Sequence, residues 1–242
     1  MRLFCHSKAA SEILCTLGQS HLMTTSPAEA TAEIAIHPRT IEDMLDAVLT
    51  IGDQVGQPAR ATDLVVHLRG RLHAAQDFIN PYVEGPPVLI LDALDPLRVP
   101  GLWVPQLVER AGGQFPWNPT IAVPDAGAAA GPQMAYRTAG EAVTITPTQA
   151  EMHRPEFVVF ALAGQSLDDA RAAVRKVTAQ SWFRSLPAAT KGQVALIEGD
   201  ALATPGPGLV DAFEFLVGFL NQREELIPQN VPWERVQKEP RA

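Results

Sequence analysis

The stretch VLILDALDPLRVPGLWVPQLVERAGG, residues 88–113, carries the pattern that decides the fold class. It opens with four apolar residues at 88–91, a run typical of a strand buried on both faces of a parallel sheet. Prolines and a glycine then interrupt the apolar pattern over 95–101 and predict a loop. Helical periodicity over 104–111, followed by two glycines, predicts a helix and its end. Strand, loop and helix in this order indicate an α/β fold.

The second half of the chain repeats this alternation. Short apolar runs at 143–145, 157–160 and 194–197 predict three further strands of the same, mainly parallel sheet. Ser166 can cap a helix between the last two runs, and an apolar face over 209–220 predicts a final helix. Residues 81–227 are therefore expected to form one doubly wound α/β lobe.

The first third of the chain is mostly helical. Residues 40–56 and 64–79 have apolar side chains at helical spacing, so residues 40–80 are predicted to be a helical connection. Residues 1–39 offer one short helix at 11–17 and one strand at 33–36. At the other end, residues 228–242 are polar and are expected to form a loose tail.

The composition excludes several function classes. A formal net charge of −8 opposes nucleic-acid binding, because phosphate neutralisation needs clustered Lys and Arg. No apolar run is long enough to span a membrane. No secretory leader is recognisable, so the chain as encoded is expected in the cytoplasm.

Catalysis is not expected either. No nucleotide-binding, P-loop or nucleophile motif is present in the sequence. Asp92 and Asp95 follow the 88–91 strand and could serve as an acid–base pair, but no His or Lys lies near them in the chain. An enzyme therefore ranks last among the functions considered.

The two cysteines, Cys5 and Cys15, leave three interpretations open. Cys15 can be a buried free thiol on the apolar side of its helix, which is the plainest reading. Cys5 and Cys15 can form a disulfide, or they can join His6 and His21 around a metal ion, although this spacing matches no zinc motif.

Two stretches resemble a known family, the corrinoid (cobalamin-type) substrate-binding proteins of ABC importers. They are residues 88–113, with a Gly-x-Trp-Val-Pro turn into a helix, and residues 199–220, GDALATPGPGLVDAFEFLVGFL. Weaker similarity lies in SEILCTLG at 11–18 and HPRTIEDMLDAVLTIGDQVG at 37–56. The resemblance implies a class III periplasmic-binding-protein fold: one complete doubly wound lobe, a backbone helix, and a reduced N-terminal lobe at 1–39. The family carries several further elements where residues 18–33 stand here.

The resemblance implies non-catalytic binding of cobalamin or a related corrinoid, with no covalent cofactor. A broad, mostly apolar macrocycle suits a cleft walled by an indole and small side chains. Trp103 is the best candidate for that wall, unless it packs in the core. Glu141 corresponds to a carboxylate with which the family docks on the membrane permease. The remaining ligand-binding candidates are Asp95, Pro96, Gly101, Trp117, Asp200, Ala201 and Leu202.

Two alternatives remain open. A siderophore or haem binder would use Arg98, with Tyr136 and Arg137 nearby. An interaction or scaffold protein that has lost ligand binding would instead pair through helix faces left uncovered by the reduced lobe, which makes a homodimer plausible.

Overall fold

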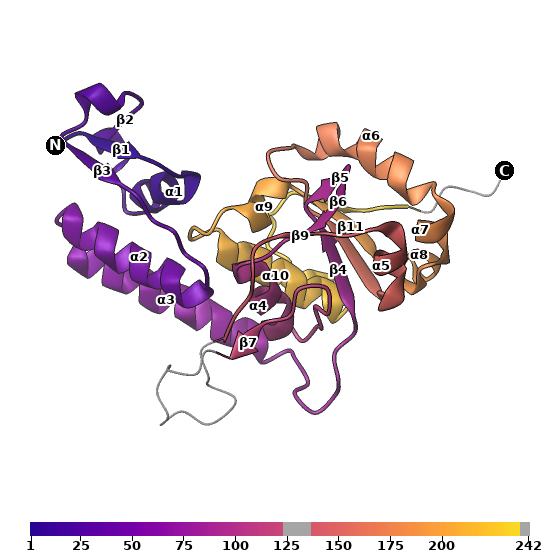
Figure 1. The fold of residues 1–242 in the computed structure, drawn as a ribbon. Helices are drawn as coiled ribbons and strands as arrows, with labels where there is room; N and C mark the ends of the chain where they lie inside the picture. The colour runs from indigo at the N-terminus through magenta and orange to yellow at the C-terminus, as the bar shows by residue number, and fades with distance from the viewer. Residues whose placement is uncertain (123–136, 238–242) are drawn as a thin grey trace.

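The computed structural model describes residues 1–122 and 137–237, which form two lobes joined by a helical hairpin (Figure 1). The first lobe holds a parallel sheet in the order β2-β1-β3 and one α-helix, α1, which Ser7 caps by accepting the Ala10 amide. Two of its strands were not predicted from the sequence, because runs of two or three residues carry no periodicity. The elements are β1 (Leu3–Cys5), α1 (Lys8–Thr16), η1 (Ser20–Leu22), β2 (Met23–Thr24), η2 (Pro27–Glu29) and β3 (Ala32–Ile34).

The connection is an antiparallel pair of helices, α2 (Ile41–Gln54) and α3 (Pro58–Gln76). A capping box begins α2: the Thr40 hydroxyl accepts the Asp43 amide, and the Asp43 carboxylate accepts the Thr40 amide. The apolar faces of α2 and α3 belong to the continuous core. Val66 of α3 lies outside this buried face and is exposed.

The start of α2 is fixed to the second lobe. Gln106, a buried residue of α4 (Trp103–Arg110), accepts the Ile41 amide at 2.9 Å and donates to Glu42 at 3.0 Å. Arg110 of the same helix forms an ion pair with Glu42. These contacts hold the junction between the lobes in one position.

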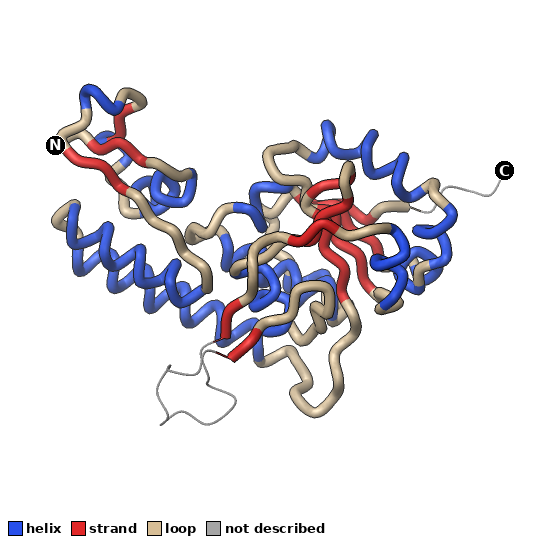
Figure 2. The backbone as a smooth tube through the Cα atoms, in the orientation of Figure 1, coloured by secondary structure: helices blue, strands red, loops and turns tan. Residues whose placement is uncertain are grey.

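The second lobe is built on a four-stranded sheet in the order β12-β11-β10-β4. Figure 2 shows the strands of this lobe in red with helices around them. Three predicted apolar runs form its parallel strands β4 (Val88–Leu91), β10 (Phe157–Phe160) and β11 (Val194–Ile197), and all twelve of these residues are buried. Burial on both faces is what makes each strand a continuous apolar run.

Alternate side chains of β10 meet helices on opposite faces of this sheet. Phe157 contacts Phe219 of α10 (Leu209–Leu220), with ring centroids 5.4 Å apart. Phe160 stacks on Phe183 of α7 (Ser181–Ser185) at 5.6 Å. Helices on both faces confirm the predicted doubly wound arrangement. The remaining helices of this lobe are α5 (Pro147–Met152), α6 (Leu167–Thr178), α8 (Pro187–Lys191), α9 (Gly199–Ala203) and η4 (Glu224–Leu226).

The run at 143–145 was wrongly assigned to the parallel sheet. It forms β9 (Val143–Thr144), which pairs antiparallel with β6 (Leu97–Val99) in a separate small sheet that also contains β5 (Ala93–Leu94). Val143 is exposed and Thr144 is polar, so these three residues lack the continuous apolar run of a strand buried on both faces. A further small pair joins β7 (Ile121–Ala122) to β8 (Arg137–Thr138).

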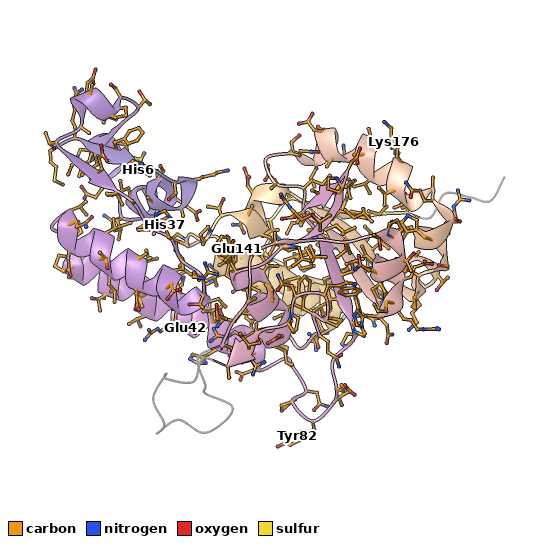
Figure 3. The ribbon with its side chains drawn as sticks, in the orientation of Figure 1. His6, His37, Glu42, Tyr82, Glu141 and Lys176 are labelled. Carbon is orange, nitrogen blue, oxygen red and sulfur yellow. The ribbon has the colours of Figure 1, made fainter. Side chains whose placement is uncertain are left out.

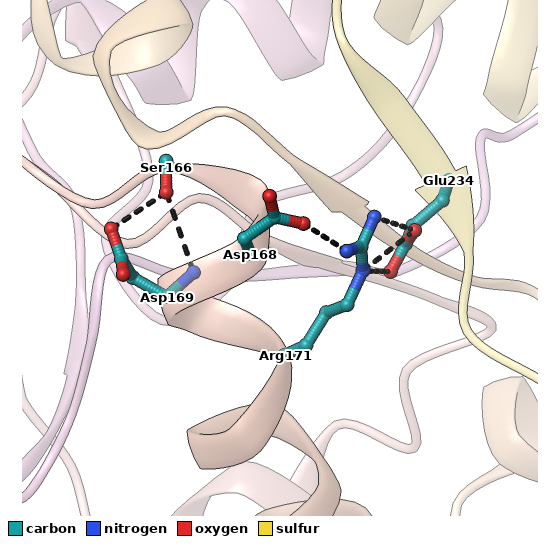
Figure 4. Close-up of polar contacts among 5 residues, drawn as sticks. All are labelled: Ser166, Asp168, Asp169, Arg171 and Glu234. Carbon is teal, nitrogen blue, oxygen red and sulfur yellow. Dashed lines mark hydrogen bonds and ion pairs between the residues drawn. The ribbon is translucent and has the colours of Figure 1, made fainter.

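The expected loose tail at 228–242 is also corrected. Within it, β12 (Trp233–Arg235) pairs antiparallel with β11 and closes one edge of the sheet. Glu234 of this strand accepts three hydrogen bonds from Arg171 of α6, at 2.9, 3.1 and 2.8 Å, and Asp168 pairs with the same guanidinium (Figure 4). Figure 4 also shows Ser166 capping α6, as the sequence predicted. A charged pair between distant segments leaves no sequence signal.

Candidate functional site

A pocket of about 170 Å³ opens at the carboxyl edge of the second-lobe sheet. Asp92 follows β4, Ala161 follows β10, and Leu202 lies on α9, which follows β11. This edge is where open α/β sheets place their ligands. The lining is mostly apolar and comprises Ile90, Asp92, Pro100, Gly101, Leu102, Trp103, Val104, Glu141, Ala142, Ala161, Leu202 and Ala203.

Trp103 forms one wall of this pocket. The residue begins α4, is half-buried, and packs against the core. Its indole Nε1 donates to the Leu202 carbonyl oxygen at 2.8 Å, a bond that fixes the orientation of the ring. The structure therefore places Trp103 beside Asp92 and the 200–204 segment, at the sheet edge where the sequence analysis expected a cleft residue.

Gly101 serves the pocket through backbone packing. A Cβ at this position would lie 2.5 Å from the Glu141 carbonyl carbon and closer still to the Gly140 oxygen. The adjoining Leu102 amide donates to Gly140 at 2.8 Å, and Leu102 itself has a φ of 56°. Positive φ is strained for a leucine and is found mainly where surrounding contacts enforce it. The wall before Trp103 is thus held tightly against the 140–141 segment.

Both carboxylates of the lining are paired with arginines. Asp92 accepts Arg98 Nε at 2.8 Å, and this contact raises the pKa of the guanidinium. Glu141 accepts Arg39 Nη1 at 3.0 Å, which joins the second lobe to the segment entering α2. Figure 3 shows Glu141 at the junction of the lobes. The pairing with Arg39, which the sequence analysis did not identify, joins residues 102 positions apart and so could not be read from spacing.

Asp200 lies on α9 beside the pocket but is not among its lining residues. Its carboxylate forms an ion pair with Lys8 of the first lobe and accepts the Gly164 amide at 3.3 Å. The hydrogen bond from Lys8 lowers the pKa of Asp200. Residues 199–203, which include the predicted ligand residues Asp200, Ala201 and Leu202, form a short helix.

The remaining predicted ligand residues do not line the pocket. Asp95 and Pro96 are exposed in the turn between β5 and β6, and Ala201 packs against the core. Trp117 donates to the Gln149 carbonyl oxygen at 2.8 Å and contacts His153, so it packs on α5 instead. None of these four residues lines the pocket.

The residues weighed for a siderophore or haem site are also accounted for. Tyr136 lies outside the described residues. Arg137 donates to Thr120 at 2.7 Å and lies 3.6 Å from Glu109, and it is not part of the lining described above. Arg98 is committed to Asp92.

The cysteine interpretations are resolved in favour of free thiols, with one correction. Cys5 and Cys15 are both unbridged, and Cys15 is exposed rather than buried. Its neighbours Ile13, Leu14 and Leu17 occupy the buried face of α1, which turns Cys15 outward. Within residues 1–122 and 137–237 no cluster of His, Cys, Asp or Glu is placed to hold a metal ion. Over the same residues, no helix is both long and apolar enough to cross a bilayer.

Solved structures resemble this chain over nearly its whole length. A periplasmic binding protein from Veillonella parvula has a TM-score of 0.69 at 14% identity, covering 91% of both chains. A periplasmic haem-binding protein from Pseudomonas aeruginosa has a TM-score of 0.66 at 17% identity, covering 91% of this chain and 92% of that one. A periplasmic vitamin B12 binding protein of Vibrio cholerae has a TM-score of 0.65 at 12% identity, covering 93% and 98%.

These matches confirm the class III periplasmic-binding-protein type of fold that the resemblance implied. The covered share exceeds what residues 40–242 alone supply, so the likeness extends into the first lobe. No protein-family model and no curated protein matches the chain. The solved structures differ in the ligand that their descriptions name, haem for one and vitamin B12 for another.

Proposed function

We propose that this chain is a non-catalytic binding protein that takes one edge of a corrinoid into the Trp103 pocket. The observation that carries the proposal is the lining itself: an indole and small apolar side chains at the carboxyl edge of the sheet, with both carboxylates already paired. Such a surface can cover a macrocycle without burying an unpaired charge.

The charge distribution favours an uncharged, amide-bearing edge over an anionic one. Arg98 and Arg39, the guanidiniums that reach the lining carboxylates, are committed to Asp92 and Glu141. An incoming carboxylate or catecholate would have to break one of these pairs and leave an uncompensated charge behind. An anionic siderophore is therefore the weaker candidate.

Haem is disfavoured by a separate observation. Haem proteins hold the iron with His, Cys, Met or Tyr, and none of the described lining residues is of these types. A corrinoid can supply axial ligands of its own, so it needs shape and apolar contact rather than a protein ligand. Because the likeness to a haem-binding protein is one of fold, haem stays in the experiment as the alternative.

The pocket volume sets how the ligand would sit. Pockets that enclose a drug-sized ligand hold roughly 300–1,000 Å³, whereas this one holds about 170 Å³. A macrocycle would therefore insert one edge beside Trp103 and leave most of its area between the lobes.

An ABC-importer permease remains the proposed protein partner, with Glu141 as the contact. Its side chain is 73% exposed but paired with Arg39, so docking through this carboxylate would have to displace Arg39. The solved structures are described as periplasmic, whereas the start of the sequence suggested the cytoplasm. Fractionation of the native host would locate the protein.

The test is a titration with hydroxocobalamin and, separately, with hemin, followed by visible absorption. Trp103→Ala should weaken corrinoid binding about tenfold to a hundredfold, since a large apolar wall contributes on the order of 1–3 kcal/mol. Trp117→Ala is the matched control and should leave the affinity unchanged, because that indole packs on α5. Equal losses in the two variants, or binding of hemin alone, would reject the corrinoid proposal.

A further inference from the structure

The first lobe reaches the second through two side chains on one face of α1. Lys8 and Glu12 are one helical turn apart and so lie side by side. Lys8 forms the ion pair with Asp200, and Glu12 Oε1 accepts the Gly208 amide at 2.5 Å. Both contacts are made with residues 200–208, the segment that runs from α9 to the start of α10.

This segment is shaped to receive Glu12. A Cβ at residue 206 would lie 2.7 Å from the Glu12 Cδ, and one at residue 208 would lie 2.9 Å from Oε1. Glycine at both positions leaves the space that the carboxylate occupies. The amide it binds belongs to Gly208, the residue before α10, where a carboxylate also meets the favourable end of the helix dipole.

The same segment shapes the Trp103 pocket. Leu202 and Ala203 line it, and the Leu202 carbonyl accepts the indole hydrogen bond. Asp200 lies two residues before Leu202 on a helix of five residues. At the base of α9, a Cβ on Gly199 would lie 2.8 Å from the Ala163 amide nitrogen, so this helix end is packed against backbone. The two anchored points, Asp200 and residues 206–208, therefore flank Leu202 and Ala203 in the chain.

We propose that Glu12, assisted by Lys8, is a positioning residue for the Trp103 pocket. It touches no lining residue, but it holds the 200–208 segment in the position at which Leu202 binds the indole. The first lobe thereby controls the shape of a pocket that is built from the second lobe. The consequence for ligand affinity rests on the proposed function, whereas the effect on Trp103 does not require a ligand.

The experiment measures indole fluorescence of the full chain without ligand, in the natural sequence and in a Trp103→Phe background. Glu12→Ala should shift the emission to longer wavelength as the indole loses its carbonyl partner, and this shift should vanish in the Trp103→Phe background. Glu12→Gln keeps an acceptor oxygen and should restore most of the natural spectrum. Glu29→Ala is the matched control, because that carboxylate pairs with Arg2 within the first lobe.

Two variants at Gly206 test independently whether the 206–208 backbone leaves space for the Glu12 carboxylate. Gly206→Ala should displace the carboxylate and reproduce the shift, while Glu12→Ala combined with Gly206→Ala should partly reverse it because the new methyl fills the vacated space. Lys8→Ala acts at a partly exposed pair, should give a shift in the same direction, and should fold normally.

Ligand titrations separate the two proposals. If corrinoid binds, Glu12→Ala should weaken it about fivefold or more, as typical couplings between sites do. If no corrinoid binds while the emission shifts, the proposed function fails and the positioning role stands. Emission of Glu12→Ala and Lys8→Ala equal to that of Glu29→Ala would overturn the positioning role.

Discussion

Gly101→Ala tests the packing that holds the pocket wall. The added Cβ would lie 2.5 Å from the Glu141 carbonyl carbon, where ordinary contacts begin at 3.4 Å, so two backbone segments must separate by about 1 Å. Overpacking of this kind costs about 1–3 kcal/mol. Loss of the hydrogen bond from the Leu102 amide to Gly140 adds roughly 0.5–1.5 kcal/mol. We expect a total loss of about 2–4 kcal/mol in the free energy of unfolding.

Urea denaturation should be used to compare the free energies of unfolding of Gly101→Ala and of its control, Gly140→Ala. Gly140 faces the same contact, but a Cβ there meets only the Asn118 Oδ1 atom, at 3.6 Å. Each substitution replaces glycine with alanine and so lowers the conformational entropy of the unfolded chain by the same amount. The difference between the two free energies of unfolding therefore reports contacts in the folded state. Gly140→Ala should stay within about 0.5 kcal/mol of the natural protein. Equal stability of the two variants would refute the close approach and, with it, the tight wall before Trp103.

Two further predictions concern the helices. Gly70→Ala should raise the free energy of unfolding by about 0.5–1 kcal/mol in urea denaturation. Gly70 lies exposed inside α3, and an added Cβ meets no atom within 4 Å. An unchanged free energy of unfolding would mean that α3 is not helical at this position. Burial raises the pKa of Glu12 above its ordinary 4.5, against the Gly208 hydrogen bond, with Asp211 adding to the rise and Lys8 opposing it. The stability of the natural protein should therefore fall, relative to Glu12→Gln, as the pH rises from 4.5 towards 7 in paired denaturation curves, and a constant difference between the two would contradict the raised pKa.

The elements that could be predicted are those whose burial produces a recognisable pattern of apolar residues in the sequence. Strands β4, β10 and β11 are buried on both faces and therefore appear as uninterrupted apolar runs. Helix α2 shows apolar spacing that matches its buried residues, whereas α10 is apolar along nearly its whole length and is buried on nearly all sides. The capping box of α5 followed the same readable rule, with Thr146 accepting the Gln149 amide, but it was overlooked.

What could not be predicted depends on partners far away in the sequence. Strand β9 owes its place to pairing with Arg98 and Val99, and strand β12 to Arg171. Trp117 has the aromatic character expected of a cleft residue, yet its N–H finds the Gln149 carbonyl 32 residues on. A tryptophan is placed by the acceptor it reaches, and only the fold decides which acceptor is near.

In the candidate site, the residues of the apolar wall could be predicted from the sequence, whereas the charged residues that contact it from the first lobe could not. Gly101 and Trp103 were predicted because a turn beyond a strand has a recognisable composition, and the structure places both in the lining. Lys8, Glu12 and Arg39 were not predicted, because each meets its partner across the junction of the lobes. All three belong to the first lobe or its exit; Arg39 contacts the lining residue Glu141, and Lys8 and Glu12 contact the 200–208 segment that includes the lining residues Leu202 and Ala203. The first lobe and its exit therefore contribute charged contacts near the site, while the second lobe contributes its apolar surface.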